Sequence, residues 1–254
     1  MSSHGLKINR FPPVNFIRTG AMKSLPGPRA VKCELRVLLA RILPRLGEKD
    51  LLIVAAFLVG SLNPRGPYML LQLLGPQGSG KSTLLKMIKR LIDPSALEGR
   101  SLPHTERDLM IAAQNSWLLC FDNVSKLPQW LSDAFCRIGT GGGIGTRELY
   151  SNAGEVIFSA MRPVLINGIG DVIDRPDLKE RTLVLNLPEV RQRRTEREIW
   201  KEFDEIAPSI LGVLARCIVS ALSPSSLAEP VSLPRMADWY LFVRRALPVM
   251  GFSP

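Results

Sequence analysis

Histidine and cysteine are scarce in this 254-residue chain, which has two histidines and four cysteines. The cysteines, Cys33, Cys120, Cys136 and Cys217, are widely spaced and form no C-x-x-C pair. Structural zinc sites take their ligands from closely spaced Cys and His residues, so the sequence argues against one. The longest apolar run, Leu51–Gly60, is too short to cross a bilayer and favours a buried helix. We expect no membrane span, no secretory leader and a cytoplasmic protein.

The composition is suited to a folded core, with 46% hydrophobic and 22% charged residues. The length allows one large α/β domain with a small appendage. The formal net charge of +10 favours a polyanionic partner such as nucleic acid. Net charge alone does not choose between nucleic acid, an acidic membrane surface and simple solubility.

A glycine-rich stretch, Gly75–Ser82, reads GPQGSGKS and fits the phosphate-binding loop pattern G-x-x-x-x-G-K-[ST]. In such a loop successive backbone N–H groups point at the phosphates of a nucleotide. Lys81 then reaches the β- and γ-phosphates, Ser82 holds Mg²⁺, and the helix that follows adds its positive N-terminal end. The candidate ATP-binding residues are Gly75, Gln77, Gly78, Ser79, Gly80, Lys81, Ser82 and Thr83.

The residues around this loop agree with the motif. Tyr68–Leu74 is an apolar run apart from Gln72, which is typical of a strand buried on both faces. Lys81–Ile92 has apolar residues at helical spacing and is stopped by Asp93-Pro94. Strand, loop and helix therefore follow in the order that nucleotide binding requires.

The rest of the chain divides into three segments. Residues 1–30 are rich in proline and glycine and predict an irregular arm. Residues 31–190 hold two helices, Val31–Ile42 and Gly47–Leu62, followed by the ATPase core. Residues 191–254 form a helical C-terminal segment, which opens with a charge run at 191–201 and contains two helices, to about Leu222 and at Met236–Leu247.

A second buried-strand pattern, Trp117–Phe121, ends in Asp122-Asn123. A carboxylate at the end of a core strand holds the Mg²⁺ shell in enzymes with this loop, so Asp122 is the candidate metal residue, with Ser82. An Asp-Asn turn is the alternative.

Asn123 stands where many such ATPases place a glutamate that polarises the attacking water, and an amide cannot accept a proton. Either hydrolysis is slow, or Asn123 only orients the water, or another acid acts: Asp108, Glu148 and Glu155 are the candidates.

Two further positions are candidates for catalysis. The short strand Val164–Ile166 ends in Asn167, whose amide can sit between metal-bound water and the γ-phosphate; a turn asparagine is the alternative. Arg181 follows a short helix and precedes a predicted strand, Thr182–Leu187. From there it can project into a neighbouring subunit's ATP site, where a guanidinium stabilises the transferring phosphoryl group. Arg175, or surface arginines paired with Asp174 or Glu180, are the alternatives.

The stretch from Gly139 to Asn152, GTGGGIGTRELYSN, predicts a glycine-rich hairpin with Val156–Ser159. Arg147 and Tyr150 offer a cation and a stacking ring, which are the two elements of single-stranded nucleic acid binding. An ordinary hairpin with a mobile glycine hinge remains the alternative.

Taken in order, GPQGSGKS, WLLCFDN, the hairpin, VLIN and an arginine before a strand resemble superfamily-three helicases, a branch of the AAA+ ATPases. The chain is similar to helicase- or primase-associated ATPases of phages and bacterial mobile elements over about residues 50–245. The resemblance implies that Lys81 and Ser82 bind ATP and Mg²⁺. It also implies that Asp122 is the strand-end acid, Asn167 the sensor and Arg181 the subunit-bridging arginine, with the Arg147–Tyr150 hairpin reaching into a central channel. Asn123 departs from the pattern, and a second expected departure is that no primase or origin-binding domain accompanies the core.

We therefore expect an α/β fold: a three-layer P-loop core with a mainly parallel sheet, and helical segments at both ends. The expected function is an ATP-dependent DNA motor with cofactors ATP and Mg²⁺, assembled as a homo-oligomeric ring on single-stranded DNA. The alternative is a nucleotide switch that hydrolyses ATP slowly and acts through assembly or partner binding. A small-molecule kinase is a weaker alternative, because the hairpin has no evident place in it.

Overall fold

The computed structural model describes residues 19–147, 155–168, 170–190, 192–224, 227 and 230–253. Its core is a four-stranded sheet in which every neighbouring pair is parallel. In spatial order the strands are β2 (Leu119–Val124), β5 (Val164–Gly168), β1 (Leu70–Leu74) and β6 (Thr182–Asn186). The predicted α/β fold with a parallel sheet is confirmed.

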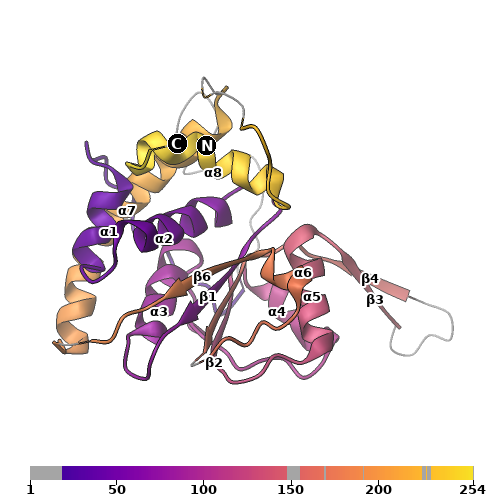
Figure 1. Ribbon diagram of the computed structural model, residues 1–254. Helices are drawn as coiled ribbons and strands as arrows, with labels where there is room; N and C mark the ends of the chain where they lie inside the picture. Colours follow the sequence, from indigo (N-terminus) through magenta and orange to yellow (C-terminus); the bar gives the residue numbers. More distant parts are fainter. Residues whose placement is uncertain are drawn as a thin grey trace.

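Alternate side chains of the strands point into two separate hydrophobic clusters, one on each face of the sheet. On β1, Leu71 and Leu73 belong to one cluster and Leu70 to the other. The first cluster is covered by α1 (Leu35–Ile42), α2 (Glu48–Ser61), α3 (Lys81–Ile92), α7 (Glu196–Leu222) and α8 (Ala237–Met250). The second is covered by α4 (Glu106–Asn115), α5 (Gln129–Thr140) and α6 (Pro176–Lys179), which makes three layers (Figure 1).

Several strand boundaries differ from the prediction by one to three residues, and two of the differences have a visible cause. Tyr68 lies outside the sheet because its backbone N–H donates to Gly139 O, at 2.8 Å. The second strand continues past Phe121 to Val124, with a shift in register between those two residues. Beside the shift the Asp122 N–H donates to Arg100 O, at 3.0 Å, as part of a parallel bridge between Arg100 and Phe121.

Two helices begin at capping boxes. Thr195 accepts a hydrogen bond from the Glu198 N–H and the Glu198 side chain bonds back, so α7 begins at Glu196, inside the charge run at 191–201 and not at its first residue. Thr105 and Asp108 form the same arrangement at α4, a helix that the hydrophobic pattern did not predict. The Thr105–Asp108 capping box was the sequence signal that could have identified the start of this helix.

An antiparallel hairpin, β3 (Gly143–Arg147) and β4 (Glu155–Ser159), projects away from the three layers (Figure 1). It pairs Arg147 with Glu155 at its described tip. The hairpin was predicted, but its first strand begins three residues earlier than Thr146, where the sequence predicted it to begin.

Within the described residues, α7 is long and apolar enough to cross a membrane, but 61% of its apolar window is buried inside the fold. It packs against α1 and α8 as a core helix.

Candidate functional site

Three of the predicted site segments meet at one edge of the sheet. The strands are parallel, so the residues that follow β1, β2 and β5 lie at the same edge. Strand β5 lies between β1 and β2, which brings Asn167 between the glycine loop (Gly75–Ser82) and Asp122. The sequence order of the motifs did not show this convergence; the strand order creates it.

The glycine loop takes backbone conformations that favour glycine. Gly75, Gly78 and Gly80 have φ of 143°, 76° and 86°. At Gly75 a Cβ would lie 2.5 Å from Leu187 O, so the loop packs directly on the chain after β6. Helix α3 begins immediately after Gly80, at Lys81.

Lys81 is folded back onto the loop. Its Nζ donates to Gly75 O at 2.7 Å and to Pro76 O at 2.8 Å, and its exposed fraction is 8%. Burial lowers the pKa of Lys81, and the charge of Asp122 acts in the opposite direction. The lysine is thus held by neutral carbonyls, which an anion can replace.

Ser82, Asp122 and Asn167 form a connected cluster. Ser82 Oγ donates to Asp122 Oδ1 at 3.0 Å, and the Asn167 amide donates to Ser82 Oγ at 3.1 Å and also to Asp122 Oδ1. Asn167 is almost fully buried, yet its Oδ1 has no hydrogen-bond partner among the described residues. A hydroxyl, a carboxylate and an unsatisfied amide oxygen are the hard ligands that suit Mg²⁺ or its bound water.

Asn123 is the one non-glycine residue in the described segments with a positive φ, at 57°. Its backbone N–H donates to Asp122 Oδ1 at 3.0 Å, and its exposed side chain lines the cavity beside the glycine loop. Asn tolerates this left-handed conformation better than most residues.

Three acids were proposed as substitutes for Asn123, and the structure describes the backbone position of two of them. Asp108 caps α4 and does not line the cavity. Glu155 lies on the hairpin strand β4, and Glu148 falls outside the described residues.

A cavity of about 1150 Å³ lies over the glycine loop. Besides the loop and the first turn of α3, it is lined by residues 42–45 before α2 and by residues 187–190 after β6. The first turns of α7 complete it with Glu196, Ile199 and Glu202. Its walls combine apolar side chains, such as Ile42 and Leu187, with charged ones.

Two arginines in this cavity were not predicted. Arg45 donates to Ser79 O at 3.2 Å and to Pro188 O at 3.1 Å, so it joins the glycine loop to the chain after β6. The Arg193 guanidinium lies 3.7 Å from the position of a Cβ on Gly78. Neither residue belongs to a motif, and only the fold brings them to the loop.

Arg181 lies at the opposite edge of the sheet from its own glycine loop. It precedes β6, and its carbonyl accepts from Leu70 N at 2.9 Å, at the start of β1. The glycine loop follows the far end of β1, roughly 16 Å away at the rise of a strand. Arg181 therefore does not reach the loop of its own chain.

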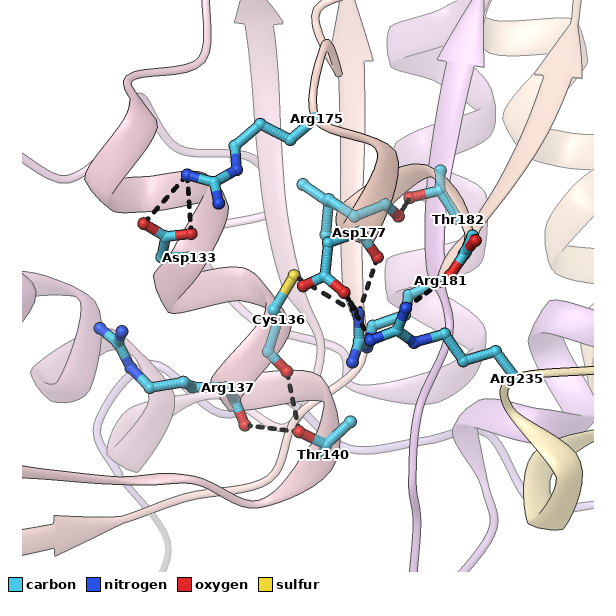
Figure 2. A network of polar contacts seen from close by, with 11 residues as sticks. Asp133, Cys136, Arg137, Thr140, Arg175, Asp177, Arg181, Thr182 and Arg235 are labelled. Carbon is cyan, nitrogen blue, oxygen red and sulfur yellow. Dashed lines mark hydrogen bonds and ion pairs between the residues drawn. The ribbon is translucent and has the colours of Figure 1, made fainter.

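Figure 2 shows that Arg181 points into a network at this edge. Its guanidinium pairs with Asp177 and donates to Asp177 O at 2.7 Å, and Asp177 also pairs with Arg235 at 2.6 Å. The suggested surface pairing with Asp174 or Glu180 is wrong for Arg181, because Asp177 lies one helical turn before it. Glu180 instead pairs with Arg235, at 2.6 Å, and Arg175 pairs with Asp133, at 3.1 Å.

For the predicted nucleic-acid contacts, the structure places Arg147 at the last described residue of β3. Tyr150 lies outside the described residues. The DNA-binding role of both residues stays a prediction.

Comparison with solved structures identifies the fold. The chain is similar to the apo C-terminal region of NrS-1, with 20% identity and a TM-score of 0.52, over 79% of this chain and 49% of that one. SCCmec type IV Cch, described as an active helicase, matches at 13% identity and a TM-score of 0.47, over 96% of this chain and 51% of that one. The chain thus spans about half the length of each of these solved chains.

No curated protein matches the chain. The sequence model of one family matches residues 42–246, and it describes an actinomycete integrative conjugative element replication protein. The matched range contains the glycine loop, Asp122, Asn167 and the hairpin. It also contains helices α2 to α7 in full and α8 as far as Ala246. The chain belongs to this family of replication proteins from actinomycete integrative conjugative elements.

Proposed function

We propose that the protein is an ATPase of the helicase-like AAA+ type, related to superfamily three, that acts on DNA during replication of a mobile element. The observation that supports this most is the hydrogen-bonded cluster of Ser82, Asp122 and Asn167 next to Lys81, because Lys81, Ser82 and Asn167 line one cavity. Lys81 and Ser82 come from the first turn of α3, Asp122 from β2 and Asn167 from β5, and each has the chemistry that its proposed role requires.

ATP is proposed to place its phosphates against the glycine loop and Lys81. The triphosphate would take over the lysine from Gly75 O and Pro76 O, which hold it now. The base and ribose would lie toward Ile42, Leu187 and Ile199, which line the same cavity. Arg45 and Arg193 lie close enough to the loop to add positive charge there.

Mg²⁺ fits the oxygen ligands of Ser82 and Asp122, with Asn167 beside them. The metal would neutralise phosphate charge during transfer to water. Asn167 would orient that water through its unsatisfied Oδ1, while its amide keeps Asp122 in place.

The DNA role is proposed from the family and from the hairpin. Arg147 and Tyr150 on the projecting hairpin would contact single-stranded DNA by charge and stacking. Arg181, at the edge opposite to its own glycine loop, is proposed to act on a neighbour's ATP in a head-to-tail ring. Such a protein would act in the cytoplasm, without a membrane partner.

A slow nucleotide switch is the second candidate, and one observation favours it. Asn123 stands in the cavity beside Asp122, where an efficient ATPase needs a proton acceptor. In that case ATP binding would control assembly or a partner, with little turnover.

Titration calorimetry of ATP with Mg²⁺ tests the shared first step. We expect one ATP site per chain that is lost when Asp122 and Lys81 are both replaced by alanine. Binding of ATP by that double variant with the parent's affinity would contradict the assigned site.

A further inference from the structure

Positive charge is concentrated at the start of the chain. The first 33 residues contain six Lys and Arg and no Asp or Glu, so they carry six of the ten net positive charges. The remaining 221 residues carry 27 Lys and Arg against 23 Asp and Glu. Basic arms of this kind are typical of nucleic-acid-binding proteins. The described part of this segment, residues 19–33, is called the basic arm below.

The basic arm is fixed to the body by its backbone. Lys23 N donates to Pro94 O at 2.9 Å, beyond the end of α3, and Arg29 N donates to Pro208 O at 2.7 Å, within α7. Met22 also forms a β-bridge with Ser95. The arm therefore crosses from α3 to α7 along a defined path.

Helix α7 is shaped to receive the arm. A Cβ on Gly212 would lie 1.9 Å from Arg29 O, so glycine is needed for the arm to pass this close. One turn further on, the Arg216 side chain donates to Val31 O at 2.7 Å and to Cys33 O at 3.2 Å. These contacts hold the arm's backbone, while Val31 and Cys33 pack their side chains against the core.

Three cations project from the arm: Lys23, Arg29 and Lys32 are all exposed. Within the described residues none of the three forms an ion pair or a side-chain hydrogen bond. The acids on the adjoining part of α7, Asp204 and Glu205, are exposed and lie in no ion pair with the arm. The arm thus presents three exposed cations that form no ion pair with the part of the chain that the structure describes.

We propose that the basic arm binds the sugar–phosphate backbone of duplex DNA, independently of base sequence. Residues 19–33 contain no aromatic side chain, so the base stacking that single-strand binding uses is not available to them. Duplex DNA offers the densest row of phosphates, about one charge per 1.7 Å of helix axis. The arm would hold duplex while the hairpin contacts the single strand. This extends the proposed DNA role and does not depend on ATP.

The test is the salt dependence of binding to a fluorescent duplex of about 30 base pairs, measured by anisotropy without nucleotide. The variant is the triple replacement Lys23→Gln, Arg29→Gln and Lys32→Gln. The slope of log K against log salt is negative, and each lost phosphate contact reduces its magnitude by about 0.9. The arm triple is therefore expected to have a slope that is smaller in magnitude by about two to three. ATP affinity should not change.

A matched triple, Lys49→Gln, Arg107→Gln and Lys126→Gln, removes the same charges from exposed positions outside the arm. It should keep the parent's slope. The proposal is overturned if the arm triple keeps that slope, if both triples lower it equally, or if the parent prefers phosphatidylserine vesicles to the duplex at equal salt. A parent that binds the duplex but not ATP would contradict the ATPase and leave the arm supported.

Discussion

Ser82 and Asp122, forty residues apart in the chain, are joined by a hydrogen bond of 3.0 Å from Ser82 Oγ to Asp122 Oδ1. The bond connects the first turn of α3 to the end of β2 across the carboxyl edge of the sheet. It brings together the two oxygen ligands proposed for Mg²⁺, with the Lys81 ammonium beside them.

Lys81→Ala should weaken ATP binding by about 10- to 100-fold, because a hydrogen-bonded charge facing an anion contributes about 1.5–3 kcal/mol. Lys86→Ala is the matched control, since it removes a half-exposed lysine from the same helix. Calorimetry with ATP and Mg²⁺ gives both affinities. Equal losses in the two variants would mean that Lys81 has no particular role.

Asn123→Asp should raise ATP turnover by about 10²-fold or more, the range of a positioned general base. Aspartate suits this test because it also tolerates the left-handed conformation found here, φ 57°. Asp122→Ala should remove Mg²⁺-dependent turnover. If neither change affects the steady-state rate, the strand-end acid has been assigned to the wrong strand.

Arg181→Ala should bind ATP in its own loop but lose about 10³–10⁵ in turnover, because the arginine is proposed to act in a neighbouring subunit. Mixing it with Lys81→Ala protein should restore part of the activity. Asp177→Asn is the control, since it weakens the Arg181 ion pair and keeps the arginine. If Asp177→Asn is equally inactive, or if a co-assembled mixture stays inactive, Arg181 has a structural role and Arg175 becomes the candidate.

Asp93→Ala should lower the free energy of unfolding by about 3–5 kcal/mol, the usual cost of leaving one buried charge unpaired. Asp93 Oδ2 lies 2.5 Å from Lys89 Nζ and accepts from Trp117 N at 2.8 Å. It thus ties the end of α3 to the chain entering β2. Urea unfolding measures the change, and Asp204→Ala, at an exposed position, should cost less than about 0.5 kcal/mol.

The parts of the fold that were predictable from sequence are those with local signals. The glycine loop and the helix at Lys81–Ile92 were predicted with their observed bounds, because the glycines and the apolar spacing act within a few residues. The parallel sheet followed from apolar runs such as Tyr68–Leu74. Helix α4 was missed because its first signal is the Thr105–Asp108 cap and not a clear apolar period.

The candidate site was less predictable, because its members meet only through the strand order. Asn167 lies between the loop and Asp122 since β5 is inserted between β1 and β2. Arg45 reaches Ser79 O from the chain before α2, and no motif marks it. The pairing of Arg181 with Asp177 likewise depends on one turn of α6, for which sequence offered several acids.

The measurement that tests the central claim most directly is steady-state ATP hydrolysis by the parent with and without single-stranded DNA, with Lys81→Ala alongside. The account predicts Mg²⁺-dependent turnover that rises with DNA and is lost in the variant. ATP binding without turnover in either condition would support the switch. Turnover that Lys81→Ala retains, or no ATP binding at all, would contradict the account.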